Sequence, residues 1–252
     1  MDAIATAGLT RIFGAKRAVD DLTLTVRQGD IYGFVGRNGS GKSTDMKMIC
    51  GLVPQTAGTV RIFGEQFAPG TTSRRIGALI EDPGFYPGFA RLDNVRCRAL
   101  SLGLPDEKAA SARALEQVGL AEVARKKAKA YSLGMKQRLG LAMALVGSPD
   151  ILMLDEPFNG LDPQVVREVR SLIVRLAETR GVTVFISSHV LDQLERMVTR
   201  YGVIREGRLV REVTAAEVEA ECADYLNVRC ADTELALSVL QTAFPQAVFS
   251  VM

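Results

Sequence analysis

The sequence has no apolar run that approaches the ~20 residues needed to cross a membrane as a helix. Its first residues, 1–6, also lack the basic segment followed by an apolar one that marks a secretory signal. We therefore expect that any work at a membrane depends on a second chain, which supplies the spanning segments.

A strong charge of either sign and clustered cysteines are missing as well. The 31 basic and 29 acidic side chains nearly cancel, so no broad positive field is available to bind a nucleic-acid backbone or an anionic bilayer. The four cysteines have no metal-ligand spacing and mostly apolar neighbours, which indicates reduced cytosolic thiols: Cys50, Cys97, Cys222 and Cys230. We expect a cytoplasmic protein with no nucleic-acid partner.

A chain of 252 residues with 47% hydrophobic content is long enough to bury a substantial core. Its alternating or continuous apolar runs predict strands at 21–26, 31–35, 58–63, 76–80, 151–154 and 182–187. Helical patterns occur from about 92 to 146 and from 163 to 180. Strands that alternate with helices are typical of a parallel sheet with crossover connections, so we expect an α/β core interrupted by a helical insertion.

A small α/β appendage is predicted at residues 214–252, after a hairpin turn at Glu206-Gly207-Arg208. It would hold helices near 215–221 and 234–244 and a strand near 225–229. A strand-like run at 247–251 indicates either that the chain continues further or that this strand pairs elsewhere.

The pattern of glycine, four residues and Gly-Lys-Ser lies between a predicted strand and a predicted helix. Such glycines let backbone N–H groups converge on phosphate oxygens at a helix N-terminus. Lys42 would reach the β and γ phosphates of a nucleotide, and the Ser43 hydroxyl would bind Mg²⁺. The candidate nucleotide-binding residues are Gly36, Arg37, Asn38, Gly39, Ser40, Gly41, Lys42, Ser43 and Thr44.

Two carboxylates follow the apolar run at 151–154. Asp155 stands where an acid at a strand end can hold Mg²⁺ through water. Glu156 would point to the other side if the strand continued, which suits a general base that polarises the attacking water. With the phosphate loop, this pair predicts ATP binding and hydrolysis.

Three further segments resemble the nucleotide-binding subunits of ATP-binding-cassette (ABC) proteins. Tyr131 to Arg138 resembles the family's signature motif, with Leu133 where glycine is commonest. Asn159 to Asp162 resembles the loop that crosses the dimer interface. His189, the only histidine, follows a predicted strand where the family places its γ-phosphate sensor. The resemblance covers roughly residues 3–213.

This resemblance implies a P-loop NTPase core with a parallel sheet, an N-terminal antiparallel β subdomain, a helical signature subdomain at about 92–146, and the appendage. It implies that Phe13 stacks on adenine, with a packing role as the alternative. Ser132 and Gly134, at a helix start, would contact the nucleotide of a partner subunit. The implied partners are a second ATP-binding subunit, forming a homodimer or heterodimer, and a transmembrane permease at the inner face of the membrane.

Two positions depart from the family pattern. Glu81 stands where most relatives have a glutamine that joins Mg²⁺ and the attacking water. An ionised carboxylate can bind the metal but cannot donate a hydrogen bond, so Glu81 remains a catalytic and metal-binding candidate. Asp45 would favour the helix dipole but weaken phosphate binding through its like charge, and Arg37 would offset that charge or face solvent.

Glu81, the segment 84–87 and the Ser-Leu-Gly-Met signature resemble the subgroup that exports bacitracin-like and lantibiotic peptides from bacterial cells. The leading hypothesis is therefore the ATPase subunit of a membrane exporter. One alternative is a soluble family member that acts on ribosomes or DNA, but such members usually have two cassettes or a long coiled coil. Another is a binding-only module with an inactive site, which Glu81 and Asp45 would favour.

Overall fold

The computed structural model describes residues 1–121, 126–221, 230 and 233–246. The chain divides into two compact units, Met1–Glu217 and Val218–Met252. The first unit contains every residue that the sequence marks as a site candidate.

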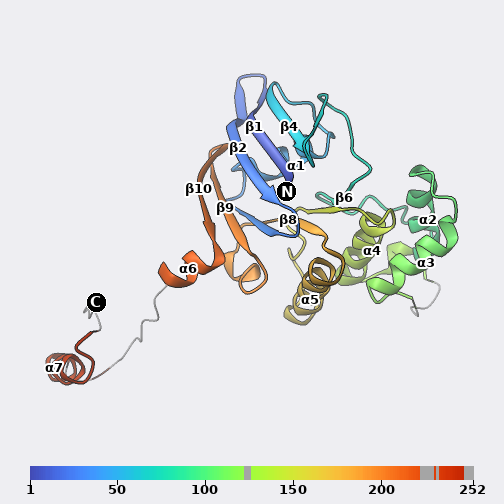
Figure 1. Ribbon diagram of the computed structural model, residues 1–252. Coiled ribbons are helices and arrows are strands. Elements are labelled where there is room, and N and C mark those ends of the chain that lie inside the picture. Colours follow the sequence, from blue (N-terminus) through green and yellow to red (C-terminus); the bar gives the residue numbers. More distant parts are fainter. Residues whose placement is uncertain (122–125, 222–229, 231–232, 247–252) are drawn as a thin grey trace. The chain divides into compact units, whose positions relative to one another are not determined.

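The described strands of the first unit form two sheets (Figure 1). An antiparallel sheet has the order β2-β1-β4-β5, with β1 (Asp2–Phe13), β2 (Lys16–Arg27), β4 (Ala57–Ile62) and β5 (Glu65–Phe67). A larger sheet has the order β10-β9-β3-β8-β7-β6, with β10 (Arg208–Thr214), β9 (Arg200–Arg205), β3 (Ile31–Val35), β8 (Thr183–Ser188), β7 (Ile151–Leu154) and β6 (Ile76–Leu79). Its strands pair in parallel except for the antiparallel β9–β10 hairpin. The predicted α/β fold class, with an N-terminal antiparallel sheet, is confirmed.

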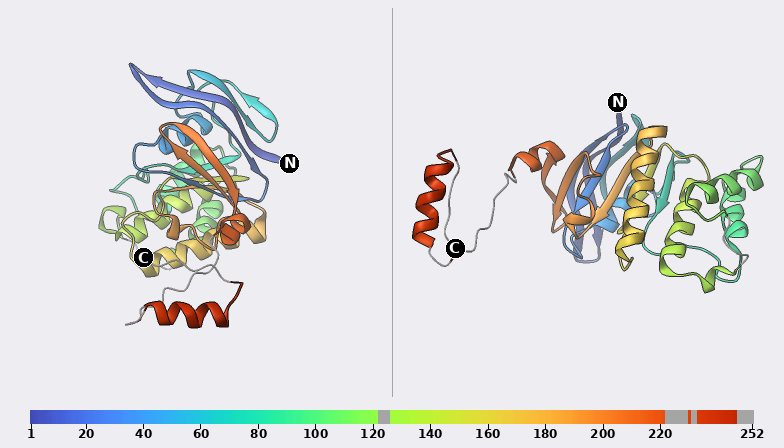
Figure 2. Two further views of the ribbon diagram at one scale, coloured as in Figure 1. Left: turned by 90° about the vertical axis from the view of Figure 1, so that its left-hand side faces the viewer. Right: turned by 90° about the horizontal axis from the view of Figure 1, so that it is seen from below.

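The helices occupy the places that the periodicity predicts. α1 (Lys42–Ile49) follows β3, and α5 (Pro163–Arg180) connects β7 to β8. α2 (Arg91–Ser101), α3 (Glu107–Gln117) and α4 (Leu133–Leu145) gather in a lobe of their own (Figures 1 and 2). Short 3-10 turns occur at Ala128–Ala130 and Leu191–Gln193. In the part of the chain that the structure describes, no helix combines the length and apolarity of a membrane span.

The hairpin and the appendage helices also follow the sequence prediction. The turn between β9 and β10 has Glu206 at φ 52° and Gly207 at φ 79°, the two positive angles that a tight hairpin turn requires. The expected helices correspond to α6 (Ala215–Glu221) and α7 (Thr233–Ala243). The strands expected at 225–229 and 247–251 lie outside the described residues.

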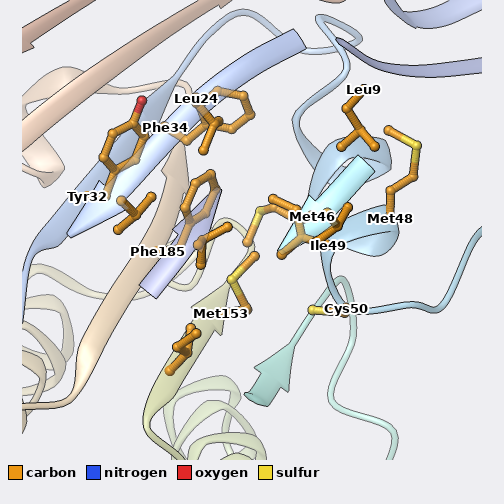
Figure 3. Packing of buried hydrophobic residues seen from close by; sticks show 14 of the residues in the cluster. Leu9, Leu24, Tyr32, Phe34, Met46, Met48, Ile49, Cys50, Met153 and Phe185 are labelled. Atoms are coloured by element: carbon orange, nitrogen blue, oxygen red, sulfur yellow. The ribbon is translucent and has the colours of Figure 1, made fainter. Parts of the chain in front are cut away.

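The main core of the first unit lies between its two sheets, with α1 in the middle (Figure 3). Met46 of α1 is fully buried in the same cluster as Leu24 of β2 and Phe34 of β3. Phe185 of β8 stacks against Tyr32 with ring centroids 5.2 Å apart. Each such side chain contributes about 1.5–3 kcal/mol on burial. Because this packing fixes α1, it also fixes the loop that precedes the helix.

One carboxyl group lies inside this core. Asp45 of α1 is fully buried, and neither of its carboxylate oxygens has a hydrogen-bond partner. Burial raises the pKa of Asp45 to about 8, because the charged form is disfavoured away from water. From the sequence we expect a charged Asp45 that favours the helix dipole and weakens phosphate binding, and this expectation is corrected. Near neutral pH the side chain is largely protonated. Its repulsion of phosphate and its attraction to the helix dipole are therefore both weak.

Replacing this carboxyl should stabilise the protein. We expect Asp45→Thr to raise the free energy of unfolding at pH 7.5 by ~1–3 kcal/mol, the cost of leaving a buried polar group unsatisfied. The threonine hydroxyl can bond to the carbonyl four residues earlier in the helix. Urea unfolding followed by circular dichroism measures the difference.

The gain in the free energy of unfolding from Asp45→Thr should depend on pH. The unfolded chain loses the Asp45 proton near pH 4, whereas the folded chain keeps it up to about pH 8, so wild-type stability falls across this window. The advantage of Asp45→Thr should grow from pH 4 to pH 8 and then level off. Glu116→Gln, at an exposed position on α3, is the control. A gain that does not change with pH would contradict the burial argument.

Candidate nucleotide-binding site

The phosphate loop connects β3 to α1 and needs glycine at two positions. A Cβ at Gly36 would lie 2.5 Å from the carbonyl oxygen of Ile204, and one at Gly41 would lie 2.6 Å from that of Ala18. Gly41 also has φ 111°. The first backbone bond of α1 runs from the N–H of Asp45 to Gly41 O, so the preceding N–H groups of the helix have no intrahelical acceptor and can bind an anion.

Other loop residues differ in exposure. Ser40 is buried, and its Oγ has no hydrogen-bond partner in the structure. The exposed members of the loop are Arg37, Asn38 and Gly39, and the half-buried ones include Ser43 and Thr44. The Arg37 side chain therefore faces solvent, which is one of the two expected possibilities.

Lys42 lies inside the loop, with a side chain that is only 6% exposed. Its Nζ donates to the carbonyl oxygens of Gly36 at 2.7 Å and Arg37 at 3.3 Å. The same ammonium lies 3.2 Å from Glu156 Oε1. The loop lysine and the proposed base are therefore already in contact.

His189 joins this pair from the end of β8. Its Nδ1 lies 2.8 Å from Glu156 Oε2, and its backbone N–H donates to the same oxygen at 3.3 Å. The His189 side chain remains 33% exposed. The structure thus brings Lys42, Glu156 and His189, which are far apart in the sequence, into one cluster at the carboxyl edge of the sheet.

The direction expected for the Glu156 side chain rests on the condition that the strand continues through this residue. That condition is wrong. β7 ends at Leu154, and Glu156 has φ 48°, so the chain turns at this point. Ser187 supports the turn: its Oγ accepts the Glu156 N–H at 2.9 Å and donates to Asp155 Oδ1 at 2.6 Å. Ser187 was not a predicted site residue, although a serine pair directly before the only histidine was the signal available in the sequence.

Asp155 and Ser43 have the oxygen donors that suit Mg²⁺. The Asp155 side chain is buried at the edge of the sheet, and its backbone N–H donates to Leu79 O at 2.9 Å. Among the described residues, no group of three or more histidine, cysteine or acidic side chains is placed to hold a metal. Mg²⁺ usually takes one or two protein oxygens and completes its shell with phosphates and water, so this small donor set fits it.

Glu81 is not part of the cluster. It follows β6 with φ 60°, and its carboxylate pairs with Lys47 of α1 at 2.5 Å. Its side chain is 63% exposed. The structure therefore gives Glu81 a partner that the sequence did not suggest, rather than a contact with the other candidate metal ligands.

Phe13 and the signature residues have contacts of their own. Phe13 is 45% exposed, and the Arg11 guanidinium lies 4.4 Å from its ring centroid. Ser132 caps α4, with its Oγ accepting the Met135 N–H at 3.3 Å. Among the described residues, no hydrogen bond or ion pair joins Ser132 or Gly134 to the phosphate loop.

Comparison with known proteins identifies the family of this chain. The family model described as ABC transporter matches residues 19–159. The bacitracin transport ATP-binding protein BcrA of Bacillus licheniformis is 42% identical over 243 residues, which cover 96% of this chain and 79% of that protein. The lantibiotic transport ATP-binding protein SrtF of Streptococcus pyogenes is 36% identical over 204 residues, covering 81% and 87%.

A solved structure gives the same result for the fold. The dimeric structure of MJ0796, a bacterial ABC transporter cassette, has a TM-score of 0.76 and 25% identity, and the match covers 84% of this chain and 98% of that one. The family match spans more than half of the chain and includes both the phosphate loop and the acidic pair. The resemblance stated from the motifs is confirmed: this chain belongs to the ABC transporter family and is an ATP-binding and ATP-hydrolysing protein.

Proposed function

We propose that this chain is the ATPase subunit of a bacterial exporter that removes peptide antibiotics of the bacitracin or lantibiotic type. The observation that carries this proposal is the 42% identity to BcrA, a bacitracin transport protein, along 96% of the chain. The named relatives reported above act in transport, which favours this function over action on ribosomes or DNA. The protein would act in the cytoplasm, at the inner face of the membrane, beside a separate permease.

The cluster around Glu156 provides a route to hydrolysis. We propose that the Lys42 ammonium moves from Glu156 to the β and γ phosphates when ATP binds, leaving the carboxylate to accept a proton from the attacking water. The two contacts from His189 hold that carboxylate in place. We propose that the imidazole then contacts the γ-phosphate. Ser43 and Asp155 would hold Mg²⁺, which neutralises phosphate charge when bound. Phe13 would stack on adenine.

One chain supplies only half of the proposed catalytic site. Ser132 and Gly134 lie at the start of α4, where a hydroxyl and backbone N–H groups can meet an anion. We propose that they contact the nucleotide of a second ATP-binding subunit and that ATP closes the two subunits together. In this arrangement residues 1–213 are the ATPase domain, 214–252 are a separate appendage, and the surface near 81–90 receives the permease.

The first prediction from this proposed function concerns turnover. Lys42→Ala removes the buried ammonium that contacts Glu156, so we expect ATP hydrolysis to fall by ~100-fold or more, as when a preorganised charge is deleted from an active site. Phosphate release measures this loss, and Lys108→Ala on the exposed side of α3 is the matched control. No turnover in either protein would favour a binding-only module, whereas equal turnover in both would contradict the role proposed for Lys42.

The second prediction concerns assembly. Glu156→Gln keeps the side-chain shape but removes the base, so the variant should bind ATP without hydrolysing it and accumulate as a dimer. Light scattering should show a doubled mass with ATP but not with ADP. Glu116→Gln should remain monomeric after it has consumed its ATP. A Glu156→Gln variant that stays monomeric with saturating ATP would count against closure by ATP.

The third prediction concerns transport. Expressed in a sensitive bacterium with the permease genes that neighbour its own gene, the chain should raise the bacitracin concentration that stops growth, and Lys42→Ala should not. Tagged protein should co-purify with the permease from detergent-solubilised membranes. Recovery with ribosomes instead, together with unchanged sensitivity, would support the soluble alternative.

A further inference from the structure

A second lysine on α1 contacts Glu81, the predicted site residue that lies outside the cluster of Lys42, Glu156 and His189. Lys47 Nζ lies 2.5 Å from Glu81 Oε1. Lys47 belongs to the helix that begins at the phosphate loop, whereas Glu81 comes directly after Ile80 at the end of β6. The contact therefore ties the phosphate-loop helix to the loop that leaves the edge strand of the sheet.

The position of Glu81 makes its charge important. β6 pairs in parallel with β7, with Leu79 opposite Leu154, so Glu81 and Asp155 leave the same edge of the sheet. Glu81 therefore adds a carboxylate to the edge of the sheet at which the proposed function places ATP phosphates. Repulsion between like charges falls only with the inverse of their distance, and it is about four times stronger at an effective dielectric constant of 20 than in water.

Two carboxylates at this edge of the sheet form ion pairs with lysines of α1. Glu156 pairs with Lys42, and Glu81 pairs with Lys47, five residues further along α1. The Lys47 side chain is 27% exposed, less than the 63% of Glu81, so the lysine lies on the protein side of the contact. Glu81 also has a positive φ of 60°, which is uncommon for a residue other than glycine. The ion pair thus joins α1 to a glutamate whose backbone has an uncommon conformation.

We infer that Lys47 is a positioning residue for Glu81: it fixes the carboxylate beside α1 and cancels its charge, so that an acidic side chain at the end of β6 does not oppose ATP binding. This inference rests on the proposed function, because it requires ATP phosphates at the loop. The alternative is an ordinary surface ion pair, which contributes little to stability and nothing to nucleotide affinity.

A double-mutant cycle distinguishes the positioning role of Lys47 from an ordinary surface ion pair. The variants are Lys47→Gln, Glu81→Gln and the double substitution, and the readout is the Kd of a fluorescent ATP analogue in EDTA, which involves neither metal nor turnover. We expect Lys47→Gln to weaken binding about three- to tenfold, since ~1.4 kcal/mol corresponds to a tenfold change. The double variant should recover most of this loss, because no uncompensated carboxylate remains.

Conservative variants and a control sharpen the test. Lys47→Arg keeps the cation and should bind nearly as tightly as wild type, whereas Lys47→Met keeps the apolar stem and should resemble Lys47→Gln. With Mg²⁺ present, the change should lie mainly in the KM for ATP rather than in kcat. Lys108→Gln removes a lysine from the exposed surface of α3 and controls for net charge.

Equal losses from Lys47→Gln in the wild-type and Glu81→Gln backgrounds would overturn the inference. An unchanged Kd for ATP in folded Lys47→Gln and Lys47→Met would also overturn it. The same holds for a loss of affinity in Lys108→Gln as large as the loss in Lys47→Gln. Wild-type protein that neither binds nor hydrolyses ATP would instead overturn the proposed function, and this inference with it. Circular dichroism of each variant establishes that it is folded.

Discussion

The parallel pairing of β3, β7 and β8 is the constraint on which the candidate site depends. Parallel strands end at one common edge of the sheet, so the phosphate loop after β3, the acidic pair after β7 and His189 after β8 meet there. A backbone hydrogen bond also joins the phosphate loop to the end of β8, since the Gly36 N–H donates to Ser188 O at 3.3 Å. Packing of α1 between the two sheets then holds the loop against this edge.

Much of this arrangement could be predicted from the sequence because its signals are local. An apolar strand, a glycine-rich loop and an amphipathic helix are each encoded within about ten residues. The order of strands and helices then restricts the topology to a parallel sheet. The predicted residues Lys42, Glu156 and His189 meet in space because each directly follows, or lies just beyond, a strand that periodicity could identify. Their roles in hydrolysis remain proposals.

What could not be predicted depends on contacts between distant segments. The burial of Asp45 arises from both sheets packing over α1, and no local pattern around residue 45 reports it. The turn at Glu156 depends on the Ser187 hydroxyl, 31 residues further along the chain. Likewise, Glu81 and Lys47 are 34 residues apart, so their pairing becomes visible only when the loop after β6 lies beside α1.

The charges at the sheet edge explain why the phosphate loop alone does not define this site. Two acidic side chains there are each matched by a lysine of the short helix α1, while a third, Asp155, is held by the neutral Ser187 hydroxyl. Of the three, Asp155 is thus the carboxylate without a lysine partner, and the one for which a hard cation is the natural counter-charge. The distribution of lysines over these carboxylates therefore favours our proposal that Asp155, rather than Glu81, is the principal acidic ligand of Mg²⁺.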